Sequence, residues 1–283
     1  MNILDGRKLN SEISLQLKSE VTDFVDSGMA HPKLVIFQVG DNQASNIYIK
    51  RKIKFAEDTG IECEVVKFTE EISEIEILDV VNDKNKDKKV TGMILQLPIP
   101  EHLNSRKIIN YFDSNKDVDG LGDINISKLV NNDKTGIVPA TARGIEVLLN
   151  KNDIEIAGKK ICIVGRSVLV GKSTALNLIN HDATVTICHS KTKSLKDEIS
   201  DSDIIITAAG QPNLIKEDDV NSNQIILDVS INIVDKKMIG DVDKNMSPES
   251  VSGISLVPGG VGPMTVASLF LNLMDSYKKQ NKV

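Results

Sequence analysis

Apolar segments of strand length alternate with amphipathic helical stretches along most of this 283-residue chain. Apolar residues every three or four positions predict a helix over 9–24, whereas residues 62–68 alternate as a half-buried strand does. This alternation favours an α/β fold with a largely parallel sheet. The first half is predicted to hold helices over 9–24, 41–59 and 72–81 and strands over 34–37, 62–68 and 92–95. Asp41 is expected to cap the second helix and Gly60 to end it.

The second half repeats the alternation and has the rhythm of a doubly wound nucleotide-binding domain. Its predicted elements are strands over 160–164, 184–188, 203–207 and 224–228 and helices over 171–180 and 265–279. The polar residues 113–136 are interpreted as a crossing between domains, and the charged run 82–89 as a solvated loop. We therefore predict one domain over 1–138, onto which the C-terminal helix 264–283 packs back, and a Rossmann-like domain over 139–263.

The composition excludes several classes of protein. The chain has 40 acidic against 34 basic residues, a formal charge of −6, and only 3% aromatic residues. This balance predicts no broad basic surface for nucleic acid, although local basic patches remain possible, and the few aromatics disfavour a base-stacking surface. The apolar runs are too short to span a membrane. The three cysteines are far apart, and the four histidines have no ligand spacing, which predicts a reducing compartment and no metal site. We expect a cytoplasmic protein without nucleic-acid or membrane partners.

The segment 164–173 joins a predicted strand to a predicted helix, where backbone N–H groups and the positive helix end can bind a phosphate. A P-loop is excluded because Arg166 stands where its first glycine is required. The dinucleotide fingerprint is matched only by Gly165 and Gly171, so a plain tight connection remains an alternative.

The end of the next predicted strand, residues 188–192, carries hydroxyl groups and a cation but no acid. NAD sites usually place Asp or Glu here to accept from the ribose hydroxyls. Arg166, Ser190 and Lys191 instead suit the additional 2′-phosphate of NADP, which favours NADP over NAD. A solvated loop is the alternative.

Tyr48 and Lys52 lie four residues apart in the second predicted helix and therefore share a face. Lys50, Arg51 and Lys54 crowd the same segment, so like charges or burial would lower the pKa of an inward-facing Lys52 towards catalytic use. A basic helix face in solvent is the alternative interpretation.

Two further polar residues stand at the ends of elements in this half. Gln96 follows a predicted strand, and the carboxyl ends of parallel strands line the ligand crevice of an open sheet. Asp119 is either a second ligand contact or a turn residue before Gly120. Near the C-terminus, the Gly- and Pro-rich residues 257–265 predict a shaped loop, with a domain linker as the alternative.

Taken in order, these strings resemble the bifunctional methylenetetrahydrofolate dehydrogenase/methenyltetrahydrofolate cyclohydrolase family over nearly the whole chain. The strings are Leu4-Asp-Gly6, Tyr48-x-x-x-Lys52, Gln96-Leu-Pro98, Asp117-Val-Asp-Gly120, Gly165-Arg-Ser-x-x-Val-Gly171, His189-Ser-Lys-Thr192 and Pro258-Gly-Gly-Val-Gly-Pro-Met-Thr265. The resemblance implies a folate-binding first domain, an NADP-binding second domain, an active site in the cleft between them, and a homodimer joined through the NADP-binding domains. It implies oxidation of 5,10-methylenetetrahydrofolate with NADP+ and hydrolysis of the methenyl product to 10-formyltetrahydrofolate.

The same resemblance implies roles for individual residues. Lys52 is expected to be the catalytic lysine of the hydrolytic step, with Gln96 tuning its protonation and orientation. Tyr48 is expected to stack on the folate rings and Asp119 to hold the pterin. The remaining implied residues are Leu97, Gly259, Gly260 and Pro263 at the folate, and Gly165, Arg166, Ser167, Ser190 and Ile231 at the cofactor.

Four positions depart from the family pattern. Ala142, Ser173 and Leu256 replace prolines, and Ser230 replaces a glycine near the expected nicotinamide position. These changes are predicted to affect cofactor affinity and the balance of the two activities more than the fold. Two other functions remain to be distinguished: an NADP-dependent dehydrogenase of the amino-acid or shikimate kind, and a non-catalytic nucleotide-binding protein.

Overall fold

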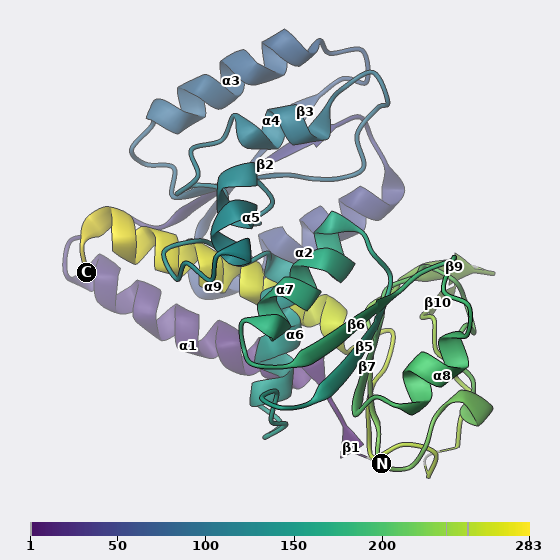
Figure 1. The fold of residues 1–283 in the computed structure, drawn as a ribbon. Helices are drawn as coiled ribbons and strands as arrows, with labels where there is room; N and C mark the ends of the chain where they lie inside the picture. The colour runs from purple at the N-terminus through teal and green to yellow at the C-terminus, as the bar shows by residue number, and fades with distance from the viewer. Residues whose placement is uncertain (1, 236, 248) are drawn as a thin grey trace. The chain divides into compact units, whose positions relative to one another are not determined.

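The computed structural model describes residues 2–235, 237–247 and 249–283 (Figure 1). The chain forms two compact units, each built from two separate segments. Unit 1 comprises residues 1–11 and 141–265, and unit 2 comprises residues 12–140 and 266–283. Helices α1 (Gly6–Asp26) and α9 (Val261–Asn281) each contribute to both units. Each unit contains a parallel sheet, as the sequence predicts.

The sheet of unit 2 has the strand order β3-β2-β4, with all strands parallel. Its strands are β2 (Lys33–Val39), β3 (Glu62–Phe68) and β4 (Gly92–Leu95), and its crossover helices are α2 (Gln43–Thr59) and α3 (Glu74–Lys86). Residues 34–37 of the central strand are fully buried, as expected for a parallel strand covered on both faces. Phe37 stacks on Phe68 and Phe112, with ring centroids 6.2 and 5.6 Å apart.

Several helix ends differ from the predicted bounds. Asn42, rather than Asp41, caps α2, because its side chain accepts from the backbone N–H of Ser45. Gly60 ends this helix in the left-handed conformation, as predicted. The charged run 82–89 is not simply a loop, because α3 continues to Lys86. The two lysines in its last turn suit the negative end of the helix dipole.

The segments between β4 and unit 1 are more structured than the sequence indicated. They contain the short helices α4 (Ser105–Asn110) and α5 (Asp123–Val130), so residues 113–136 are not a plain crossing. The C-terminal part of α9 packs against this region, since the side-chain amide of Asn272 donates to the carbonyl oxygens of Val118 and Val138 at 2.8 and 2.9 Å.

The sheet of unit 1 has six parallel strands in the order β1-β11-β8-β7-β5-β6. These are β1 (Asn2–Ile3), β11 (Gly253–Ser255), β8 (Ile225–Asp228), β7 (Ile204–Thr207), β5 (Lys160–Val164) and β6 (Thr184–Cys188). The strand order reverses between β5 and β7, which is the switch point where ligands bind in open α/β sheets. Helices α6 (Ala140–Asn150), α7 (Ser173–Ile179) and α8 (Leu195–Ser200) and the hairpin β9 (Asn232–Val234) and β10 (Lys237–Ile239) complete the unit.

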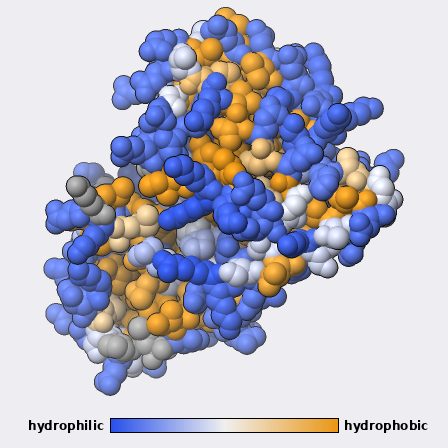
Figure 2. Space-filling view, turned by 180° about the vertical axis from the view of Figure 1, so that it is seen from behind, coloured by the Kyte–Doolittle hydropathy of each residue, from blue (hydrophilic) through white to orange (hydrophobic). Residues whose placement is uncertain are grey.

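The surface mixes hydrophilic and hydrophobic residues on the face drawn in Figure 2. Several large apolar side chains are exposed, among them Ile75, Ile187 and Ile233. Cys63, Cys162 and Cys188 are all free thiols. Within the described residues, no helix is both long and apolar enough to cross a membrane.

Candidate active site

Lys52 of α2 and Gln96 at the end of β4 meet in unit 2. The Nζ atom of Lys52 donates to Oε1 of Gln96 at 2.9 Å, and Nε2 of Gln96 donates to the carbonyl oxygen of Leu97. These two bonds fix the orientation of the amide, so that its oxygen faces the lysine. Gln96, directly after the end of β4, thus lies within hydrogen-bond distance of the Lys52 ammonium group.

The pKa of Lys52 is lowered, chiefly because burial removes water from its ammonium group. Asp119 and Cys63 oppose this shift through their charges. Burial likewise raises the pKa of Asp119 to about 6 and that of Cys63 to about 11, although Lys52 lowers both. Of the two causes that the sequence indicated for Lys52, burial is the one that acts. The structure thus brings Lys52, Gln96 and Asp119 together and adds Cys63 of β3, which no sequence motif indicated.

Asp119 lies in a loop that is fixed by a buried carboxylate two residues earlier. Asp117 accepts from the backbone N–H groups of Gly120, Leu121 and Gly122 and from the side chain of Asn125 at 2.8–3.4 Å. Gly120 has φ +70°, and a Cβ there would come within 2.7 Å of a carbonyl oxygen. Asp119 is therefore held in a rigid loop.

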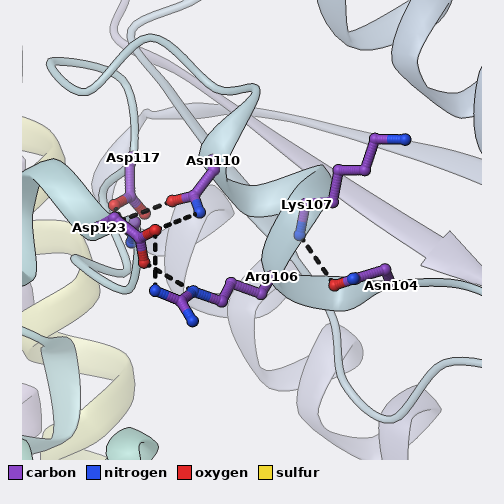
Figure 3. Close-up of polar contacts among 7 residues, drawn as sticks. Asn104, Arg106, Lys107, Asn110, Asp117 and Asp123 are labelled. Carbon is purple, nitrogen blue, oxygen red and sulfur yellow. Dashed lines mark hydrogen bonds and ion pairs between the residues drawn. The ribbon is translucent and has the colours of Figure 1, made fainter.

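A second set of polar contacts joins α4 to the beginning of α5, directly after this loop (Figure 3). Arg106 forms two hydrogen bonds with the carboxylate of Asp123, and Asn110 both donates to that carboxylate and accepts from the Asp123 N–H. A surface hollow of about 380 Å³ beside α4 is lined by Asn104, Arg106, Lys107, Asn110 and Tyr111. Arg106 and Asn110 of α4 thus hold the beginning of α5, directly after the loop that carries Asp119.

Tyr48 lies one helical turn before Lys52 and is partly buried. Burial raises the pKa of its hydroxyl, and the Arg51 guanidinium lies 5.7 Å from the ring centroid. Lys54 points elsewhere, because it pairs with Asp58 at 2.6 Å in solvent. One face of α2 thus carries Tyr48 and Lys52, while Lys54 belongs to the solvated face.

In unit 1, backbone segments lie unusually close together at the turn after β5. Gly165 has φ +135°, and a Cβ on it would lie 2.4 Å from the carbonyl oxygen of Ala208. A Cβ on Gly171 would lie 2.2 Å from the carbonyl oxygen of Gly165. Ser167 caps the π-helical turn Val168–Lys172, which precedes α7. The two glycines therefore let the chain fold back on itself, which leaves Arg166 and Ser167 exposed beside the switch point.

The loop after β6 lies next to this turn, because the N–H of Gly165 donates to the carbonyl oxygen of Cys188 at 2.9 Å. His189 and Thr192 close the loop through a bond from the His189 N–H to the threonine hydroxyl. Ser190 and Lys191 are exposed on it. The structure thus places Ser190 on the loop next to the turn that carries Arg166, and residues 189–192 of this loop include no acid. A cradle of backbone with a nearby arginine, lysine and serine fits a phosphorylated dinucleotide.

Two further groups of predicted residues also lie in unit 1. Ile231 follows β8, and a Cβ on Gly262 would lie 3.9 Å from its side chain. The loop 256–260 packs on the beginning of α1: the Arg7 N–H donates to Gly259, and a Cβ on Gly6 would lie 1.8 Å from the carbonyl oxygen of Gly260. The Asn10 side chain donates to the carbonyl oxygen of Pro263 at 2.8 Å. The string Leu4-Asp-Gly6 and the string at residues 258–265, which stand first and last in the sequence pattern, therefore lie in contact.

The predicted site residues fall into two groups, one in each unit. Tyr48, Lys52, Gln96, Leu97 and Asp119 belong to unit 2, and the glycine loops with Arg166, Ser190 and Ile231 belong to unit 1. In the part of the chain that the structure describes, no group of three or more His, Cys, Asp or Glu side chains is arranged to hold a metal ion.

Known families match both halves of the chain. A family model for the tetrahydrofolate dehydrogenase/cyclohydrolase catalytic domain matches residues 4–119, and one for the NAD(P)-binding domain of the same family matches residues 139–281. A bifunctional protein FolD from Hydrogenobaculum is 40% identical over 99% of this chain and 100% of its own length.

Solved structures agree with these matches. The bifunctional FolD dehydrogenase/cyclohydrolase of Campylobacter jejuni superposes with a TM-score of 0.97 at 39% identity, covering 100% of both chains. The FolD of Trypanosoma brucei, solved with NADP and an inhibitor, gives a TM-score of 0.94 at 29% identity, covering 99% of this chain and 98% of its own.

Fold and site together define a two-domain α/β enzyme with an NAD(P)-binding domain. The chain belongs to the tetrahydrofolate dehydrogenase/cyclohydrolase family. This assignment separates it from the amino-acid and shikimate dehydrogenases, which the sequence left open as an alternative.

Proposed function

We propose that the chain oxidises 5,10-methylenetetrahydrofolate with NADP+ and then hydrolyses the methenyl product to 10-formyltetrahydrofolate. The observation that carries the proposal is the 2.9 Å bond from Lys52 to Gln96 beside Asp119, with the pKa of the lysine lowered. In the first step the methylene carbon loses a hydride, and NADP+ is the hydride acceptor. In the second step water adds to the methenyl carbon, a proton leaves, and one C–N bond of the ring opens.

Lys52 is the proton-handling residue of the hydrolytic step. Its lowered pKa increases the neutral fraction near neutral pH, and a neutral amine accepts a proton from the attacking water. Gln96 keeps the amine oriented through its carbonyl oxygen without adding a charge that would hold the proton on the lysine. Hydride transfer needs positioning rather than an acid or base, so a site with one lysine and one amide suffices for both steps.

The remaining residues of unit 2 hold the folate. Asp119 accepts from the amino and ring N–H groups of the pterin, a task suited to a carboxylate in a rigid loop. Tyr48 stacks on the folate rings, and Leu97 contributes apolar contact. Gly259, Gly260 and Pro263 are also assigned to folate binding, as the family resemblance implies. Their packing on Arg7 and Asn10 supports a fixed loop.

The cofactor site is assigned to Gly165, Arg166, Ser167, Ser190 and Ile231, with Arg166 and Ser190 at the 2′-phosphate. The glycine turn leaves room for a diphosphate at the switch point, and the exposed arginine is free to form paired bonds with a phosphate. The NADP-bound relative from Trypanosoma brucei supports this choice.

We also propose the domain division given by the sequence, with catalytic residues 1–138 joined by 264–283 and NADP-binding residues 139–263. The protein is proposed to act in the cytoplasm as a homodimer joined through its NADP-binding domains. In support of the dimer, β6 lies at the edge of its sheet, and Ile187 on it is 38% exposed.

The test is to mix the protein with 5,10-methylenetetrahydrofolate and either NADP+ or NAD+ and to record reduced cofactor by absorbance. We expect NADPH to form, and kcat/KM to be higher with NADP+ than with NAD+. A flat trace with both cofactors would contradict the proposed dehydrogenase. A separate assay of methenyltetrahydrofolate hydrolysis without cofactor tests the second activity, and size-exclusion chromatography with light scattering tests the dimer.

A further inference from the structure

A buried carboxylate, Asp241, joins the loops that follow β7 and β8 in unit 1. Its side chain is fully buried and meets no cation among the hydrogen-bond donors that reach it. Five donors bond to its two oxygens at 2.6–3.3 Å: the hydroxyl groups of Thr207 and Ser230, the backbone N–H groups of Ala209 and Gln211, and the side-chain amide of Asn232. Among the described residues, the hydrogen bonds to this carboxylate thus come from neutral groups in and beside the two loops.

The position of Asp241 is itself fixed by Asp228 at the end of β8. The N–H groups of Asp241 and Val242 donate to the Asp228 carboxylate at 3.1 and 2.9 Å. Gly240 is required beside it, because a Cβ there would lie 1.8 Å from an oxygen of Asp228. The Asp228 carboxylate therefore holds the segment 240–242 in place. This segment in turn directs the Asp241 carboxylate towards the two loops.

Ser230 forms a direct bridge between the two loops. Its hydroxyl donates to Oδ2 of Asp241 at 2.6 Å and accepts from the N–H of Gly210 at 3.0 Å. The side chain that replaces the family's glycine is therefore turned to Asp241 and almost fully buried. A glycine at this position has no group with which to form either bond.

We propose that Asp241 and Ser230 are positioning residues for the cofactor, which hold residues 208–211 and 229–232 in the shape that receives the nicotinamide side of NADP. This inference rests on the proposed function. The loops end the strands next to the switch point, Ala208 packs against Gly165, and Ile231 lies on the second loop. A loop that is ordered before binding loses less entropy when the cofactor arrives, so the affinity is higher.

The experiment compares full-length Ser230→Ala and Asp241→Asn with the parent protein. Calorimetry gives the Kd for NADP+, and steady-state assays give KM and kcat for the dehydrogenase. Ser230→Ala is expected to raise Kd and KM about tenfold with a smaller change in kcat, since it removes a hydrogen bond to a charged group. Asp241→Asn is expected to have a larger effect, because an amide N–H₂ group then faces donors. Hydrolysis of methenyltetrahydrofolate without cofactor should stay within about twofold of the parent rate for Ser230→Ala.

Ser202→Ala is the matched control. Ser202 is also buried in unit 1, and its hydroxyl donates to the carbonyl oxygen of Ile199 at 2.7 Å, before β7 begins. Its loss should leave the Kd for NADP+ unchanged. A parent-like Kd and KM in Ser230→Ala would overturn the inference, even if Asp241→Asn failed to fold. Equal loss of cofactor binding and cofactor-free hydrolysis in Ser230→Ala would also overturn it, because that result indicates general destabilisation. If the parent itself did not bind NADP+, the proposed function would fail, and this inference with it.

Discussion

The Nζ atom of Lys52 lies 2.9 Å from the amide oxygen of Gln96, a residue 44 positions away in the sequence. The hydrogen-bond partner of this ammonium group is therefore neutral, and no carboxylate among the described residues forms an ion pair with it. Burial lowers the pKa of Lys52, while Asp119 and Cys63 oppose that change from further away. This balance makes the lysine a better proton acceptor than an ordinary surface lysine.

Replacing Lys52 with methionine should abolish the hydrolytic activity. Loss of a positioned proton acceptor is expected to lower the cyclohydrolase turnover about 100-fold or more, measured as the loss of methenyltetrahydrofolate absorbance. Lys54→Met is the control, because Lys54 lies on the same helix but pairs with Asp58 in solvent. Hydrolysis by Lys52→Met at the parent rate would show that another group handles the proton.

Replacing Gln96 with glutamate should move the pH profile of hydrolysis. A carboxylate at the position of the amide favours the charged lysine, so the pKa of Lys52 should rise and the acidic limb of the rate profile should move up by about one pH unit or more. Gln96→Ala removes the acceptor without adding a charge and should not produce this upward movement. Identical profiles for the parent and Gln96→Glu would refute the coupling between the two side chains.

Asp119 should limit the stability of the free protein at neutral pH. Burial raises its pKa to about 6, so the folded state holds the proton more tightly than the unfolded state. The contribution of Asp119 to the free energy of unfolding is therefore largest below about pH 4 and is lost as the pH rises through about 6. Asp119→Asn should stabilise the protein by roughly 2 kcal/mol at about pH 7 and have little effect at about pH 4, while raising KM for folate. Thermal unfolding at both pH values checks this, and an equal gain at both would show that the carboxylate charge is not responsible.

Replacing Gly171 with alanine should separate the two activities. The new Cβ would lie 2.2 Å from the carbonyl oxygen of Gly165, so the turn must open. KM for NADP+ is expected to rise about tenfold or more with a loss of roughly 1–3 kcal/mol of stability, whereas cofactor-free hydrolysis should persist. Gly158→Ala is the control, since no atom lies within 4 Å of its added Cβ and only its positive φ is strained. Unchanged NADP+ kinetics in Gly171→Ala would contradict the assignment of this turn to the cofactor.

The strands of both units were the most predictable part of the fold. The strands at 62–68, 92–95, 160–164 and 184–188 have the predicted bounds, because apolar or alternating runs bounded by polar and glycine residues are typical of them. The end of α3 was predicted too early, because charges in a last turn resemble a solvated loop in the sequence although they suit the helix dipole.

The rule that strand ends line a ligand crevice placed Gln96 at a ligand site, and the family resemblance implied its pairing with Lys52, which the structure shows. The supporting carboxylates were not accessible from the sequence. Asp117 accepts largely from backbone N–H groups, and Asp241 accepts from two such groups and from three side chains on other segments, so no local side-chain pattern marks these contacts. The nearness of Cys63 to Lys52 was also hidden, because it depends on how α2 packs on β3.

The interleaving of the units has a consequence for how the protein is made. Strand β1 at the N-terminus pairs with β11, about 250 residues later, and Gly6 packs on the loop that carries Gly260. Asn272 completes the loop around Val118 in the other unit. A ribosome delivers these late segments last, so neither unit can acquire its full set of contacts while most of the chain is being synthesised. Strand β1 can therefore join the sheet of unit 1 only after residues 253–255 have been synthesised, however early β1 itself emerges.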